Sequence, residues 1–288
     1  MNPAALLRDI ASNQLALFGG TVVAGLAAIA LVGPMLSPFD FDTQDLPGRI
    51  SPPSRVHWFG TDELGRDIFA RVVYGTRISM LVGFSAVLVS SLIGLFVGSL
   101  AGYYGRWFDE ILMRLVDVLL AFPGILLAIA LVAFWGPGLD KLIFALIAVG
   151  WVGYARLVRG QILKVKELDF VKAARSLGAS DVRIITRHLI PNIIQPILVQ
   201  ASIGMAGAIL AEASLSFLGL GVPAPLSSWG AMLNDGRNHL FDAPHLVLFP
   251  GLATMLAVMA FSFLGDGLRE ILNPRLRSLS LKSAGLRT

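Results

Sequence analysis

Long runs of apolar residues, separated by short polar segments, dominate the pattern along this chain of 288 residues. A helix needs about 20 apolar residues to cross the hydrocarbon core of a bilayer, and six stretches reach or approach that length. They lie at residues 14–36, 79–104, 111–134, 142–158, 193–217 and 246–268. Strands of a β-barrel would be about 10 alternating residues long. The pattern therefore predicts an all-α membrane protein with six transmembrane helices.

One polar stretch, residues 167–192, has a helical pattern of its own between the fourth and fifth spans. The positions i, i+3, i+4 and i+7 of one helical face are apolar, and they are Phe170, Ala173, Ala174 and Leu177. Gly178 should end this helix, Ser180 can cap a second one, and Pro191 marks a boundary before the next span. The pattern predicts a helix-turn-helix that docks onto another molecule.

The remaining segments divide the chain. We expect a terminus and retained first anchor at 1–36, because the apolar run is longer than the roughly 7 to 15 residues of a signal-peptide core. Residues 37–78 should form an external loop with a short interfacial helix, in which Ile68 and Val72 share the apolar face while Arg66 and Arg71 point elsewhere. Residues 79–272 should form a core of five spans that includes the loop 159–192, followed by a basic tail at 273–288.

Composition and charge set the topology. The chain is 55% hydrophobic and only 15% charged, with a mean hydropathy of +0.73, which excludes an ordinary soluble domain. With both termini in the cytoplasm, most basic residues also lie there, as the positive-inside bias requires. The pI near 9.7 then reflects topology and attraction to anionic lipid, not nucleic acid. The basic residues left outside are Arg49, Arg55, Arg66, Arg71, Arg77, Lys141 and Arg237.

Chemistry that would make the chain an enzyme is missing from the sequence. It holds no Gly-x-x-x-x-Gly-Lys-Ser/Thr phosphate loop, no Gly-x-Ser-x-Gly elbow and no cysteine. Its histidines lack paired-ligand spacing, so neither a metal nor a cofactor is predicted. They are His57, His188, His239 and His245.

Several residues inside the spans are candidates for a pathway or gate. Glu212, with Ser216 one turn later, is either a pathway or proton-relay group or a buried carboxylate satisfied by hydroxyl groups, and we favour the second. Asp117 should pair with Arg114 on its own helix. Pro123 can kink the third span. The repeat of Gly94, Gly98 and Gly102 predicts a close helix contact in the second span.

The loop KAARSLG, followed by HLIP, resembles the coupling signature of permease subunits of ATP-binding-cassette importers. Ala173, Ala174, Gly178 and Pro191 match it, whereas Lys172 stands where Glu is usual and His188 replaces Ile. Three further segments resemble the C-type permease of dipeptide, oligopeptide and nickel importers. They are WFGTDELGRDIFARVVYGTRIS, DVLLAFPGILLAIAL and LAEASLSFLGLGVPAPLSSWGAML.

The resemblance implies a type I importer permease with a methionine-permease-like core, which imports dipeptides or oligopeptides. It implies a homologous permease as heterodimer partner, cytoplasmic ATPases that hydrolyse ATP, and an extracytoplasmic binding protein that delivers substrate. The loop would sit in a groove of the ATPase and act as a rigid lever. The residues implied to couple to the ATPase are Phe170, Lys172, Ala173, Ala174, Leu177, Gly178, Ala179, Ser180, His188 and Pro191.

Three alternatives stay open. A nickel-complex importer of the same family would need no ligating histidines of its own. A self-contained secondary transporter would use Glu212 as its coupling group and would transport without ATP. A membrane-embedded enzyme would show activity as purified protein alone.

Overall fold

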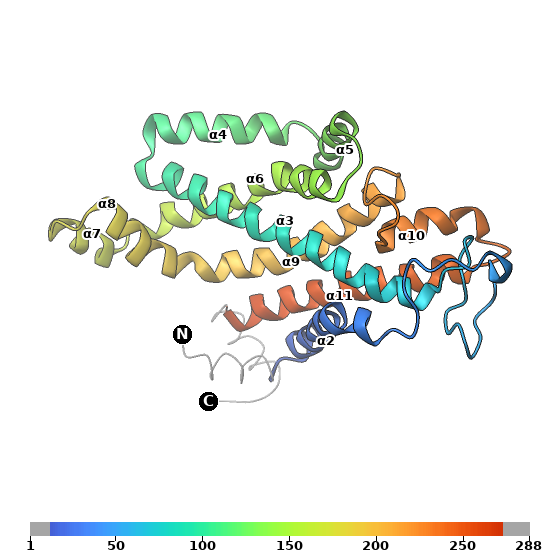
Figure 1. Ribbon diagram of the computed structural model, residues 1–288. Helices are drawn as coiled ribbons and strands as arrows, with labels where there is room; N and C mark the ends of the chain where they lie inside the picture. The colour runs from blue at the N-terminus through green and yellow to red at the C-terminus, as the bar shows by residue number, and fades with distance from the viewer. Residues whose placement is uncertain (1–11, 273–288) are drawn as a thin grey trace.

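The computed structural model describes residues 12–272. In this range the secondary structure is helical, apart from loops and one isolated antiparallel bridge between Thr61 and Asp67. The predicted basic tail at 273–288 and the first eleven residues lie outside this range. Figure 1 shows the long helices side by side, with short helices at both ends of the bundle. The helices are α2 (Gln14–Leu36), α3 (Ile68–Tyr104), α4 (Arg106–Leu120), α5 (Gly124–Trp135), α6 (Leu139–Val165), α7 (Asp169–Ser176), α8 (Asp181–Ile184), α9 (Ile190–Phe217), α10 (Trp229–Gly236) and α11 (His245–Leu272), with a π-helical turn η2 (Ile185–Leu189) and 3-10 turns η1 (Leu46–Gly48) and η3 (Arg237–His239).

Five of these helices are long and apolar enough to cross a membrane, and α4 and α5 together pass the same test as a pair bent by 83°. The bend falls at Pro123, which precedes the first residue of α5. Proline has no N–H to donate and disfavours helical geometry in the residue before it. The predicted kink at Pro123 is therefore confirmed, and it is a corner rather than a gentle bend.

The close helix contact predicted from the glycine repeat is confirmed, and it joins α3 to α6. A Cβ at Gly98 would lie 2.5 Å from the Ala155 carbonyl oxygen, and one at Gly102 would lie 2.9 Å from Ile162. Gly94 meets Tyr154 in the same seam. Residue numbers rise together along the two helices, so α3 and α6 run parallel.

Two parallel neighbours require a crossing between them, which the bent pair α4–α5 must supply. The start of α2 lies beside the end of α11, where the Asn13 amide donates to Glu270 at 2.9 Å and Gly19 packs against Leu264. Both described ends therefore lie on one side of the bundle. This requires an even number of crossings and confirms the prediction of six.

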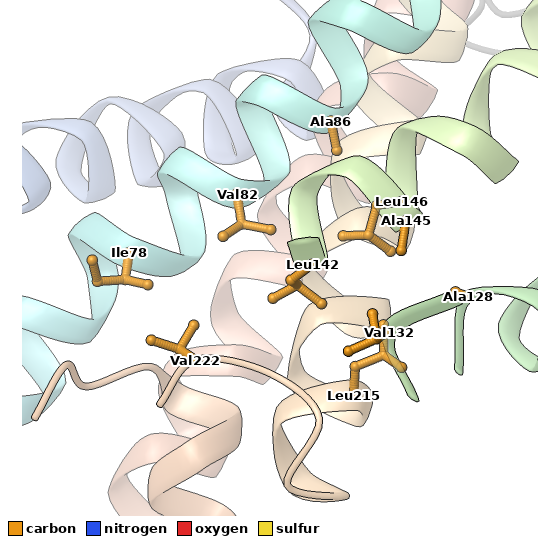
Figure 2. Close-up of a cluster of buried hydrophobic side chains, with 10 residues drawn as sticks. All are labelled: Ile78, Val82, Ala86, Ala128, Val132, Leu142, Ala145, Leu146, Leu215 and Val222. Atoms are coloured by element: carbon orange, nitrogen blue, oxygen red, sulfur yellow. The ribbon is translucent and has the colours of Figure 1, made fainter. Parts of the chain in front are cut away.

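The two ends of the bundle carry different short elements. The α7–α8 end holds the hairpin between α6 and α9, and the α10 end holds α10 and residues 37–67 (Figure 1). A buried apolar cluster packs α3, α5, α6 and α9 together toward the α10 end. Figure 2 shows its members converging from these helices and from the loop after α9. They are Ile78, Val82, Ala86, Ala128, Val132, Leu142, Ala145, Leu146, Leu215 and Val222.

The predicted short interfacial helix is wrong, because its residues form the first turns of α3. The Asp67 side chain caps this helix by accepting from the Ala70 N–H at 2.7 Å, and no proline interrupts the helix before Tyr104. At 37 residues, α3 is about 55 Å long and extends beyond a bilayer core of about 30 Å.

The charged residues at the start of α3 are buried, whereas the sequence pattern predicted that Arg66 and Arg71 would point away from the packed face. The Arg66 Nε donates to Asp62 at 2.7 Å, and Arg71 lies 3.5 Å from Asp62 and 3.5 Å from Asp235. Mutual neutralisation makes this burial possible, because an unpaired buried charge costs several kcal/mol. The ion-pair network joins the loop before α3 to α10.

Candidate functional site

The α7–α8 hairpin projects from one end of the bundle (Figure 1), and its turn depends on Gly178. Gly178 has φ +79°, and its N–H donates to the Arg175 carbonyl at 3.0 Å. The next N–H, of Ala179, donates to the Ala174 carbonyl at 3.1 Å. These two bonds form a Schellman motif, which favours glycine at the left-handed position. Ser180 then caps α8, as predicted, by accepting from the Arg183 N–H.

The inner face of the hairpin is an apolar anchor that the sequence pattern did not reveal. Val171 and Ile184 are buried and pack with Val158, Ile162 and Ile193 of α6 and α9. Val171 directly follows Phe170 in sequence and is not one of the residues of the predicted helical face. The periodicity therefore gave no reason to select it.

Polar contacts fix the hairpin to the end of α3. The Tyr103 hydroxyl donates to Asp181 at 2.6 Å, and the Arg175 guanidinium lies 5.5 Å from the centre of the Tyr103 ring. The Lys166 ammonium donates to the Gly102 carbonyl at 2.8 Å. The hairpin is thus held from α3, α6 and α9, and it can transmit force to all three.

The outer face of the hairpin, formed by Phe170, Ala173 and Leu177, is exposed. Leu177 is 88% exposed, and nothing within the described chain covers it. Ala174, predicted on this face, is half-buried, and its carbonyl accepts the hydrogen bond from the Ala179 N–H in the Schellman turn. A large apolar side chain at the tip of a short helix is what a partner protein would bury.

Two further predicted residues border this face. Lys172 is exposed and forms a surface ion pair with Glu167 at 3.4 Å. His188 is half-buried, with its ring 6.4 Å from the Phe170 ring. Both residues lie on the hairpin or its continuation, as the resemblance to importer permeases implied.

Pro191 lies at the start of α9, as the second residue of that helix, so the predicted boundary before the fifth span is confirmed, although the chain stays helical across it. A continuous helical run extends over Asp181–Phe217, and the π-helical turn η2 precedes Pro191. The wider turn changes the hydrogen-bonding register before the proline, whose ring would clash with the i−4 carbonyl in a regular α-helix. The hairpin is therefore joined directly to α9.

Glu212 lies in a polar cluster near the other end of α9. Its carboxylate is fully buried and accepts from the Ser79 hydroxyl at 2.9 Å and from the Ser216 hydroxyl at 2.7 Å. Ser228, the N-cap of α10, also hydrogen-bonds to it. The prediction of a buried carboxylate satisfied by hydroxyl groups is confirmed. The cluster joins α3, α9 and α10.

The partner predicted for Asp117 is wrong. Asp117 accepts from Arg156 of α6 rather than pairing with Arg114 on its own helix. A second pair, which the sequence pattern missed, joins Asp109 of α4 to Arg159 of α6 with a 2.6 Å bond from Nη2. The two ion pairs hold α4 beside α6. Pro123 is exposed at the corner between α4 and α5, whereas Glu212 and Ser216 are buried in α9.

Two cavities adjoin along α6 and α9. One, of about 310 Å³, is lined by α3, α5, α6 and α9. The second, of about 550 Å³, is lined by α6, α9 and α11. Gln200 lines both of them. Within residues 12–272, no group of three or more His, Asp or Glu side chains is placed to hold a metal ion.

Comparison with known families matches two parts of the chain. Residues 94–278 match the family described as binding-protein-dependent transport system inner membrane component. Residues 5–53 match the N-terminal TM domain of oligopeptide transport permease C.

Curated relatives are similar over most of their length. The dipeptide transport system permease protein DppC of Alkalihalophilus pseudofirmus is 44% identical over 271 residues, or 94% of this chain and 89% of the relative. The glutathione transport system permease protein GsiD of Pectobacterium atrosepticum is 46% identical over 272 residues, or 94% of this chain and 90% of the relative. The oligopeptide transport system permease protein OppC of Bacillus subtilis is 43% identical over 266 residues, or 92% of this chain and 87% of the relative.

Among solved structures, a chain of the MetNI methionine ABC transporter in an inward-facing conformation has the same fold. It aligns with a TM-score of 0.57 at 19% identity, covering 69% of this chain and 95% of that chain. A second crystal form gives a TM-score of 0.55 at 18% identity, covering 70% and 96%. The predicted all-α, methionine-permease-like fold is confirmed.

Proposed function

Because this chain belongs to the family of binding-protein-dependent transport system inner membrane components, we propose that it is the transmembrane permease subunit of an ATP-driven importer of dipeptides or oligopeptides. It forms half of the translocation pathway, and a homologous permease forms the other half. An extracytoplasmic binding protein delivers the peptide. Partner ATPase subunits hydrolyse the ATP, and the chain itself performs no chemistry.

The exposed apolar face of the α7–α8 hairpin is the observation that supports this function best. Phe170, Ala173 and Leu177 face outward, while Val171 and Ile184 anchor the hairpin to the bundle. The small Ala173 allows close approach, and burial of Leu177 against an ATPase would contribute about 1.5–3 kcal/mol. The outer face thus fits a docking role, and the inner face fits transmission of force.

Charge supports the orientation in which the α7–α8 end lies in the cytoplasm. Basic residues gather at this end, as the positive-inside bias requires of cytoplasmic segments. They are Lys164, Lys166, Lys172, Arg175, Arg183 and Arg187. The α10 end then faces the binding protein, and both chain termini are cytoplasmic.

The coupling step follows from the rigid connections of the hairpin. When the ATPases close, they push the outer face, and the Schellman turn keeps the angle between α7 and α8 fixed. The push passes through α8 and η2 into α9, which lines both cavities. A rigid-body movement of α9 would then switch the pathway between outward and inward access.

The test is to place a charge on the outer face without disturbing the fold. Leu177→Glu should abolish copurification of the ATPase and peptide uptake, because the change buries a carboxylate in the interface. Phe241→Glu is the matched control, since Phe241 is fully exposed at the opposite end of the bundle, and it should leave copurification unchanged. Normal ATPase copurification and normal uptake in Leu177→Glu would contradict the docking role.

A further inference from the structure

The two cavities along α6 and α9 form one groove, here called the glutamine groove because of the amide side chains that line it. Gln200 belongs to both cavities. Toward the α10 end the wall of α9 is built from small residues, Gly204, Gly207, Ala208 and Ala211. Each of the two volumes, about 310 Å³ and 550 Å³, lies within the roughly 300–1,000 Å³ typical of small-molecule sites.

Toward the α7–α8 end the lining becomes polar. Gln161 of α6 and Gln195 and Gln200 of α9 line the larger cavity, together with Arg269 of α11. Tyr154 and Gln161 stand seven residues apart on α6, which places them on one helical face. The groove therefore changes along its length from mostly small residues to a mixture of amide and larger apolar side chains.

The placement of the glutamines is selective. Apart from Gln14, the first residue of α2, every glutamine of the membrane-spanning helices lies in this groove. The only other glutamine, Gln44, lies in the loop between α2 and α3. Polar side chains within a membrane are costly unless they face a protein partner or a water-filled cavity. Their concentration on one groove gives it polar groups to which a ligand can hydrogen-bond.

The chemistry of the lining points to the peptide backbone. An amide side chain both donates and accepts hydrogen bonds, as a peptide unit does, and it carries no charge that would select among substrate side chains. Among residues 12–272, no carboxylate lines either cavity, and the one charged lining residue is the cation Arg269. Such a groove suits neutral peptides and their terminal carboxylate, and it disfavours metal cations.

We propose that Gln161, Gln195 and Gln200 are the residues of this chain that contact the backbone of the peptide during transport, so that short peptides are accepted with little regard to side chain. This inference rests on the proposed function. Arg269, at the cytoplasmic mouth, attracts the carboxylate terminus of the peptide.

The test uses the complete importer, with both permeases and the ATPases, in proteoliposomes supplied with binding protein and ATP. Gln200→Leu keeps the volume but removes the amide, and it should lower Ala-Ala uptake about tenfold, since a peptide group would lose its hydrogen bond. Copurification of the ATPase should stay within about twofold of the unaltered complex, because Gln200 lies outside the hairpin that docks onto the ATPase. Gln14→Leu is the matched control and should transport normally.

A charge variant tests the chemistry in a second way. Gln200→Glu should raise the ratio of Ala-Lys to Ala-Glu uptake about tenfold, because the new carboxylate attracts one peptide and repels the other. If the unaltered importer transports peptides, and the ratio and the Ala-Ala rate both match those of the Gln14→Leu control, the glutamine groove is not the contact surface. In that outcome the proposed function stands. An unaltered importer that moves no peptide would instead refute the proposed function.

Discussion

Substitution of Gly178 tests whether the hairpin acts as a lever of fixed shape. Its φ of +79° is a conformation that costs a non-glycine residue about 1–2 kcal/mol, and more for a β-branched side chain. Apart from Gly178 and its two chain neighbours, no described residue has an atom within 4 Å of the position that a Cβ would take. The cost of Gly178→Val is therefore confined to the backbone and should not unfold the bundle.

The magnitude follows from the population of the native turn. A loss of 1–2 kcal/mol reduces that population about 5- to 30-fold relative to other conformations. If the ATPase recognises only the native hairpin, and the native turn is not in large excess over other conformations, its affinity should fall by about the same factor. Gly178→Asn is the matched control, because asparagine tolerates the left-handed region much better, and it should weaken binding by less than about threefold.

The measurement is a titration of the purified permease pair with the ATPase, combined with peptide uptake in cells. Thermal unfolding of each variant should match the unaltered protein, which separates loss of the turn from loss of the fold. Binding and uptake within about twofold of the unaltered protein for Gly178→Val would show that the turn does not define the docking surface. Equal losses for Val and Asn would show that the side chain, not the backbone, causes the effect.

Three further predictions concern the bundle. Gly98→Val should lower the melting temperature in detergent, because overpacking the α3–α6 seam costs about 1–3 kcal/mol or more. Gly25→Ala is the control and should have little effect, because, apart from its two chain neighbours, no described residue has a side chain within 4 Å of a Cβ at Gly25. Glu212→Ala should lower the stability of the protein by about 2–4 kcal/mol through lost hydrogen bonds and a cavity. Glu212→Gln should retain uptake. Loss of uptake in a stable Gln variant would favour a proton relay. Asp62→Asn should cost about 3–5 kcal/mol, because Arg66 and Arg71 lose the buried carboxylate that they share. A denaturant midpoint unchanged by this substitution would show that the ion-pair network contributes little.

Much of the fold could be predicted from local pattern. Span length gave six crossings, the glycine repeat gave a close helix contact, and Gly178 gave the turn, because each depends on residues near one another in sequence. Pro123 was identified as a bend for the same reason. The corner of 83° needed the structure, since its angle depends on the helices that pack around it.

The candidate site was predictable only on its outer face. Leu177 and Gly178 belong to one short periodic segment, whereas the anchor packs Val171 and Ile184 of the hairpin with Tyr103 of α3, which is distant in sequence. The partners of Asp117 and Arg71 were missed for the same reason, because Arg156 and Asp235 come from other helices.

The sequence by itself determined that this chain crosses a membrane six times, which end carries the basic hairpin, and that the hairpin turns at a glycine. These properties follow from hydrophobicity, charge and backbone geometry, which act locally. Only the tertiary structure decided that α3 and α6 run parallel, that Glu212 is shared by three helices, and that the glutamines of α6 and α9 face one groove. Those features arise from packing between distant segments, and side-chain contacts of that kind leave no periodic trace in a single sequence.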